Sequence, residues 1–320
     1  MTRIVPLALL LAAATSQALA QPPAPSKPVA KPAPKQPAKP APPLDLAYGA
    51  YQRGLYLTAF REANDRIKAD PNDAAAMTLV GELYNQGLGV KRDFGDAAAW
   101  YRLAAQRGSP HAMAALGMMS LEGRGVAKDA KTAREWLEKA ASAGEPLASF
   151  NLALVLLDHG GDTDIARAAK LLELAANSEI PEAQHALGVL YSRGQGGLPQ
   201  DKAKAVLLYQ KAAYNGSLAG EVEYGIALFN GDGIEKNERL AARQFMHAAG
   251  RGNAIAQNRL ARLYVVGRGG LPRNLVEGLT WHITAKRQGL NDPWLDEQLA
   301  GVSDADRALA EQRATERSVL

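Results

Sequence analysis

The sequence predicts an all-α fold, a right-handed solenoid of stacked antiparallel helix pairs. Three observations predict it: a motif returns about every 36 residues, each copy holds two segments with helical spacing of apolar residues, and Gly, Asp or Asn residues stand where these segments end or begin. A fixed period in this range is typical of stacked units that bury their apolar faces only against their neighbours. Such an array offers an extended surface rather than a catalytic pocket, so the repeat favours a binding function.

The first helix of each copy is marked by one small residue, which recurs at spacings of 35 to 37 residues. An apolar residue precedes this marker residue directly, and in most copies a small residue stands four positions earlier still, as Ala76 does relative to Val80. Offsets of three and four place such residues on one helix face. The marker residues are Gly81, Gly117, Ala153, Gly188, Gly225 and Ala261. Glycine accepts the left-handed backbone that closes a helix, and the closing glycines are Gly87, Gly123, Gly194, Gly231 and Gly267.

The second helix has its own start signal, an Asp or Asn whose side chain can accept a backbone N–H at the N-cap. The six residues at this position are Asp93, Asp129, Asp164, Asp201, Asn237 and Asn274. Seven residues later a tryptophan stands in three copies, and we interpret Trp100, Trp136 and Trp281 as packing residues rather than ligand platforms. An Ala-Ala pair follows in five copies, and small residues there predict a close approach of neighbouring helices.

Together the glycines, the Asp cap, the Trp-Tyr pair and the Ala-Ala pair resemble the Sel-one-like repeat (SLR), a relative of the tetratricopeptide repeat, over residues 73–289. The copy at 145–180 departs from the pattern in a shortened loop, Asp158 to Asp162. We expect six repeats, preceded by a degenerate helical unit at 44–72 and followed by a capping helical segment at 290–320. The resemblance implies an α-solenoid that binds partner proteins, and many bacterial members of the family are exported adaptors or regulators.

The N-terminus predicts export. Arg3 supplies a positive charge, residues 4–14 are mostly apolar, and Ala18 and Ala20 form a small-x-small cleavage site, so we interpret residues 1–20 as a signal peptide cleaved after Ala20. This predicts a periplasmic or secreted protein, and the alternative is an uncleaved membrane anchor. The apolar stretch is too short for a comfortable membrane span, and no other segment is predicted to cross a bilayer.

Residues 21–43 differ in composition from the rest of the chain, because they hold ten prolines and four lysines but no acidic residue. Such a segment cannot bury a core and is expected to be a disordered, extended linker. We expect it to act either as a plain tether or as a weak contact with an anionic envelope polymer. Beyond it the chain carries 32 basic and 33 acidic residues, and this near-neutral balance disfavours nucleic-acid binding.

No residue pattern predicts catalysis. The chain has no cysteine, its five histidines show no metal-binding spacing, and its serines lack the neighbours of a catalytic triad. The sequence therefore predicts no catalytic, cofactor-binding or metal-binding residue, no cofactor and no enzyme. The leading interpretation is a protein-binding scaffold, adaptor or regulator of the bacterial cell envelope. The alternatives are an envelope enzyme such as a cell-wall hydrolase, and a structural protein associated with peptidoglycan.

In tetratricopeptide-type arrays the first helix of each pair lines the concave face, and we expect offsets −6, −3, +1, +4 and +5 from the marker residue to point into that groove. At those offsets the groove is apolar in the middle repeats and polar at its rims. Apolar surface of this extent usually marks an interaction site, so we predict that it holds an amphipathic helix or extended segment of a partner protein or peptide. The alternative is that tight curvature buries these residues against one another. The predicted groove residues are Phe150, Leu154, Val189, Val222, Ile226 and Phe229.

Overall fold

The computed structural model describes residues 45–317, and the predicted signal peptide 1–20 and linker 21–43 lie outside this range. Every regular element within it is a helix. In chain order these are α1 (Leu46–Gln52), α2 (Tyr56–Ala69), α3 (Ala74–Gln86), α4 (Phe94–Gln106), α5 (Pro110–Glu122), α6 (Ala130–Ser142), α7 (Pro146–His159), α8 (Asp162–Asn177), α9 (Pro181–Arg193), α10 (Lys202–Tyr214), α11 (Leu218–Asn230), α12 (Glu238–Gly250), α13 (Ala254–Val266), α14 (Leu275–Arg287), α15 (Pro293–Gln298) and α16 (Asp304–Arg317). Among residues 45–317, none of these helices is long and apolar enough to cross a membrane.

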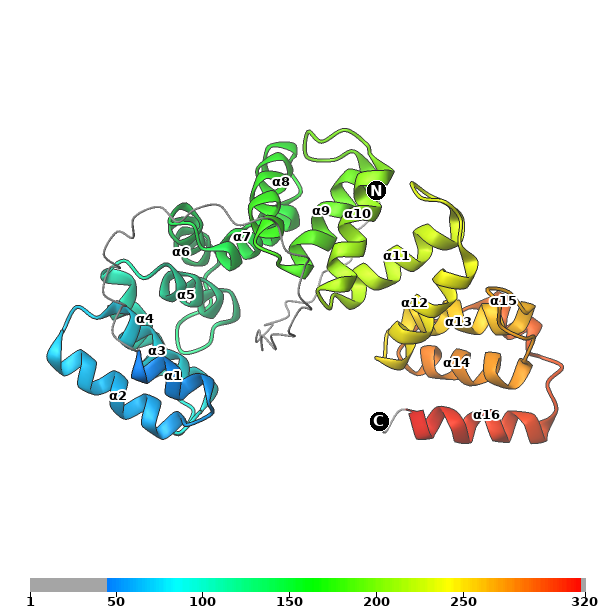
Figure 1. Cartoon of the computed structure of the whole chain (residues 1–320), viewed down its shortest axis with the longest axis horizontal. Helices are drawn as coiled ribbons and strands as arrows, with labels where there is room; N and C mark the ends of the chain where they lie inside the picture. The colour runs from blue at the N-terminus through cyan, green and yellow to red at the C-terminus, as the bar shows by residue number, and fades with distance from the viewer. Residues whose placement is uncertain (1–44, 318–320) are drawn as a thin grey trace, which may run out of the picture.

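The helices form antiparallel pairs that follow one another along an arch, with α1 to α4 at one end and α13 to α16 at the other (Figure 1). From α1 to α14 each helix packs against the next in the chain, whereas α16 packs against α14 and α15 against α13. The first helices of neighbouring repeats also touch directly, α5 against α7 and α9 against α11. In a curved stack the elements nearest the centre of curvature lie closest together, so the odd-numbered helices α3 to α13 line the concave side. The structure is thus the all-α solenoid that the repeat predicts.

The predicted N-cap residues of the second helices are confirmed in five of the six repeats. The side chains of Asp93, Asp129, Asp201, Asn237 and Asn274 each accept a hydrogen bond from a backbone N–H in the first turn of the helix that follows. The prediction for Asp164 is wrong, because α8 already begins at Asp162 with Gly161 at the N-cap. The shortened loop of the third repeat brings the helix start forward, and Asp164 therefore lies inside the first turn.

Packing explains the small marker residues. A Cβ atom added at Gly81 would lie 2.8 Å from the ring of Tyr101, and one added at Gly188 would lie 2.6 Å from the ring of Tyr209. The residue that fills the space between the two helices is thus the one after the tryptophan position. Tyr101 is fully buried whereas Trp100 is only half-buried. The tryptophan position therefore lies at the edge of this contact between the two helices.

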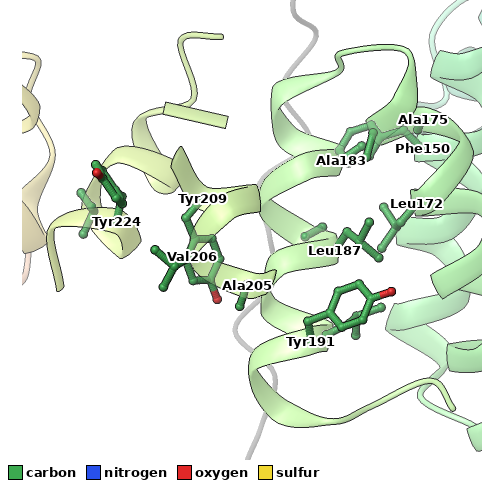
Figure 2. Packing of buried hydrophobic residues seen from close by; sticks show 14 of the residues in the cluster. Phe150, Leu172, Ala175, Ala183, Leu187, Tyr191, Ala205, Val206, Tyr209 and Tyr224 are labelled. Carbon is green, nitrogen blue, oxygen red and sulfur yellow. The ribbon is translucent and has the colours of Figure 1, made fainter. Parts of the chain in front are cut away.

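The core is a layer between neighbouring helices, made of four clusters of buried residues in the described part of the chain, rather than a single central nucleus. Its largest cluster runs from α5 to α13. Figure 2 shows part of it, where Phe150, Leu172 and Leu187 join α7, α8 and α9, and Tyr209 continues the layer into α10. Because each repeat buries its apolar face only against its neighbours, the first helices keep one face free along the concave side.

Candidate functional site

The structure separates the six predicted groove residues into two groups. Leu154, Val189, Ile226 and Phe229 are half-buried and pack with one side on the central cluster. Phe150 and Val222 are only 7% and 3% exposed. The expectation that these two face the groove is therefore corrected, since both belong to the core.

Helix geometry accounts for the burial of Phe150 and Val222. Successive residues of an α-helix are rotated by about 100°, so offsets −6, −2, +1 and +5 from the marker residue fall within about 60° of one another. Offset −3, where Phe150 and Val222 stand, is turned by about 70° from the centre of that arc toward the neighbouring helix. Offset −2, which the sequence-based groove omitted, lies inside the arc. It brings two further residues to the concave face, the half-buried Glu223 and the exposed Arg259.

Apolar side chains occupy much of this arc. Three of them are well exposed for their type: Leu147 at 40%, Ile255 at 46% and Val266 at 45%. The remaining ones are half-buried on the first helices of repeats two to five. We call this set the inner stripe; its members are Met118, Leu147, Leu154, Val189, Ile226, Ile255 and Val266. An apolar row that stays accessible along five neighbouring helices is a feature of interaction surfaces.

Charged residues flank the stripe on the last three repeats. Burial raises the pKa of Glu223, and this effect exceeds the opposite influence of the nearby guanidinium groups of Arg193 and Arg259. Both arginines are exposed. Within the part of the chain that the structure describes, neither has a carboxylate oxygen within 4.0 Å of its nitrogens. The concave face thus carries two cations without a contact ion pair, on α9 and α13, on either side of a half-buried carboxyl group on α11.

Three histidines, His185, His247 and His282, make contacts between the helices. His185 lies against the ring of Tyr209 with 5.8 Å between ring centres, and burial lowers its pKa to about 4. His247 Nδ1 lies 2.6 Å from Glu221 Oε1, and His282 Nε2 lies 2.9 Å from Asp296 Oδ1. Among residues 45–317 no group of three or more His, Asp or Glu side chains is placed to hold a metal ion.

At the end of the array the chain itself covers part of α13. Asp292, which is 5% exposed, caps α15 and accepts hydrogen bonds from Arg262 Nε at 2.7 Å, Arg262 Nη2 at 2.8 Å and Asn258 Nδ2 at 2.7 Å. The Arg262 guanidinium also lies 4.9 Å from the centre of the Trp294 ring, and Leu295 is fully buried. Arg262 and Asn258 stand at offsets +1 and −3 of the sixth repeat. A short acidic and apolar segment is therefore bound at the positions that Ile226 and Val222 occupy in the fifth repeat.

Solved structures of other repeat proteins are similar to this one. A Sel1 repeat protein from Oxalobacter formigenes has a TM-score of 0.66 and 24% identity, over 77% of this chain and 97% of that chain. The protein c5321, a protective antigen of uropathogenic Escherichia coli strains with an SLR fold, has a TM-score of 0.57 and 24% identity, over 82% of this chain and 64% of that chain. At such identities the similarity shows the fold alone.

Curated relatives match a shorter part of the chain. DAP3-binding cell death enhancer 1 from Rattus norvegicus is 36% identical over 118 residues, which are 37% of this chain and 22% of that protein. Chitin synthase regulatory factor 3 from Schizosaccharomyces pombe is 30% identical over 120 residues, 36% of this chain and 13% of that protein. The chain thus spans less than a quarter of the length of these relatives.

The repeat itself gives the broadest match. The Sel1 repeat matches six consecutive segments, residues 74–109, 110–145, 146–179, 181–217, 219–253 and 254–290. Each segment coincides with one helix pair, from α3 and α4 to α13 and α14. Together they cover more than half of the chain, and the chain therefore belongs to the Sel1 repeat family.

Proposed function

We propose that this protein is a non-enzymatic scaffold, adaptor or regulator that holds a partner protein or peptide along its concave face. The observation that carries the proposal is the inner stripe, an accessible apolar row that crosses five neighbouring first helices. Contiguous exposed apolar surface is a liability for an exported monomer unless another molecule covers it. The proposal therefore places the partner on Leu147, Leu154, Val189 and Ile226.

The cellular compartment is part of the proposal. The positive charge at Arg3, the apolar residues 4–14 and the cleavage site ending at Ala20 support export to the bacterial cell envelope. A chain without cysteine folds in an oxidising compartment without the risk of wrong disulfides. The proline- and lysine-rich residues 21–43 would then join the cleaved N-terminus to the solenoid.

The names of the relatives describe binding and regulation. The rat protein is named for binding DAP3, and the fission-yeast protein is named as a regulatory factor of chitin synthase. Their shared region with this chain is a stretch of about three repeats. This supports a repeat surface that engages other proteins, while the partner of the present chain is to be found by experiment.

The test is a crosslinking pull-down from periplasmic extract with the mature protein. A variant with Leu147→Glu and Ile255→Glu places two charges on the inner stripe at side chains that are already 40% and 46% exposed, so the fold is retained. The matched control carries Leu174→Glu and Leu207→Glu on α8 and α10, at side chains that are 58% and 59% exposed. We expect a partner that the wild type and the control capture and the stripe variant loses.

Equal capture by the stripe variant and the wild type would exclude the concave face as the binding surface. Absence of any captured protein would count against the scaffold function itself. Sedimentation with cell-wall sacculi, with and without residues 21–43, then tests the peptidoglycan-associated alternative. Circular dichroism of all three proteins shows whether the helix content is unchanged.

A further inference from the structure

In the sixth repeat a segment of the chain itself packs against a first helix, and its contacts show one chemistry that such a helix accommodates. There the segment Asp292–Leu299 lies on α13, with its carboxylate on Arg262 and Asn258, its indole ring against Arg262, and Leu295 and Leu299 in the core. A buried carboxylate with a bidentate arginine is a strong and directional contact. The segment is thus held by one anion and by apolar side chains together.

The neighbouring stretch of the concave face offers the same combination. Arg259 stands one helical turn before Arg262 on α13, and Arg193 ends α9 two repeats earlier. Val189 and Ile226 are the half-buried apolar residues of α9 and α11 that lie at the same offset as Arg262. The stretch is therefore continuous with the surface that α15 already covers, and it combines apolar side chains with two exposed guanidinium groups.

We propose that this stretch binds a peptide segment of a partner protein that carries an acidic side chain beside apolar ones, with the carboxylate between Arg193 and Arg259 and the apolar side chains on Val189 and Ile226. The inference rests on the proposed function and specifies the partner's chemistry. Charge complementarity argues against residues 21–43 of the same chain as the occupant, since they carry four lysines and no acidic residue.

The half-buried carboxyl group of Glu223 makes the binding of an acidic peptide depend on pH. It lies between the two arginines without an ion-pair contact to either, and burial raises its pKa. A carboxyl group whose pKa is raised by burial is protonated more easily than one in water. An incoming carboxylate can therefore share a proton with Glu223, while the two arginines supply the positive charge. Binding is then expected to strengthen as the pH is lowered from neutral toward the ordinary range of a carboxylic acid. Besides Glu223, Arg193 and Arg259, the titratable groups of the packed elements are Glu182 and His185 on α9, Tyr209 on α10 and Arg262 on α13.

The test uses a random dodecapeptide library displayed on phage and selected on the mature protein. We expect enriched peptides to combine Asp or Glu with Leu, Ile, Val, Phe or Trp. Synthetic copies, measured by fluorescence anisotropy, are expected to bind a variant with Arg193→Glu and Arg259→Glu at least about tenfold more weakly. The matched control carries Arg102→Glu and Arg243→Glu, exposed arginines on α4 and α12, and has the same net charge. It should bind as the wild type does.

Enrichment of basic or purely apolar peptides would overturn the inference. Enriched acidic peptides that bind the Arg193→Glu and Arg259→Glu variant as tightly as the wild type would also overturn it. A selection that enriches no peptide would overturn it as well. Binding that survives in this variant but disappears with Leu147→Glu and Ile255→Glu would leave the proposed function standing while the acidic preference fails. If the pull-down captures a partner but the selection enriches no peptide, the proposed function stands and the preference for acidic peptides fails.

Discussion

Arg262 holds Asp292 with two nitrogens of its guanidinium group, Nε at 2.7 Å and Nη2 at 2.8 Å, and so joins α13 to the segment that follows the last repeat. Burial alone would raise the pKa of Asp292, but the hydrogen bonds from Arg262 and Asn258 outweigh it and lower the pKa to about 2. A carboxyl group with a lowered pKa contributes stability above its ordinary value of 3.8 and loses it as the pH falls through the folded value.

Asp292→Asn is therefore expected to weaken the packing of α15 and α16 by about 2 kcal/mol at pH 7. The difference from the wild type should shrink as the pH falls from about 4 to about 2, because both proteins are then uncharged at this position. Urea denaturation at several pH values, with hydrogen exchange of residues 293–317 at pH 7, measures it. Glu311→Gln on the exposed side of α16 serves as the control. A difference that stays constant down to pH 2 would contradict the assignment.

Gly188→Ala is expected to destabilise the protein by about 1 to 3 kcal/mol, because the new methyl group would lie 2.6 Å from the ring of Tyr209 and force the α9–α10 pair apart. The control is Gly250→Ala at the end of α12, where a Cβ atom meets nothing within 4 Å. That change should stabilise the helix by about 0.5 to 1 kcal/mol. Thermal and urea unfolding measure both, and equal effects of the two substitutions would refute the packing argument.

His185→Phe is expected to reduce the acid sensitivity of the protein. Burial lowers the pKa of His185 to about 4, so the unfolded chain takes up its proton first, and stability is lost as the pH falls from 6.5 to about 4. This loss is at most about 3 kcal/mol, and Phe, which stands at the equivalent position as Phe150, does not titrate. The stability difference between variant and wild type, followed by urea denaturation from pH 7 to pH 4, should change in favour of the variant. A pH-independent difference would show that His185 titrates normally.

The loop of the second repeat tests contact between neighbouring units. Gly125 has a φ of 66°, and a Cβ atom there would overlap the carbonyl oxygen of Phe94, where α4 begins. Gly144 has a φ of 86° but meets nothing within 4 Å. Both Ala substitutions carry the backbone strain of a left-handed conformation, about 1 to 3 kcal/mol. Gly125→Ala should cost about 2 kcal/mol more than Gly144→Ala because of the overlap. Calorimetric unfolding compares them, and similar losses would mean that this loop does not restrain α4.

The sequence by itself determined the number of repeats, the solenoid class and most helix ends. These features depend on local chemistry, since the Asn237 side chain caps α12 and Gly231 closes α11 within a few residues of their own positions. The exception, Asp164, also has a local cause. Its loop is shortened, so the spacing that held in the other repeats placed the N-cap at Asp164, three residues after the observed N-cap Gly161.

Only the tertiary structure decided which side chains the concave face presents. Phe150 and Val222 matched the groove pattern but are buried, and Glu223 and Arg259 were omitted but are accessible. The contact of Arg262 with Asp292 likewise joins residues that no local signal connects. The physical reason is that helix periodicity defines faces only relative to one another. Which of them is covered depends on the rotation and separation of the neighbouring packed helices.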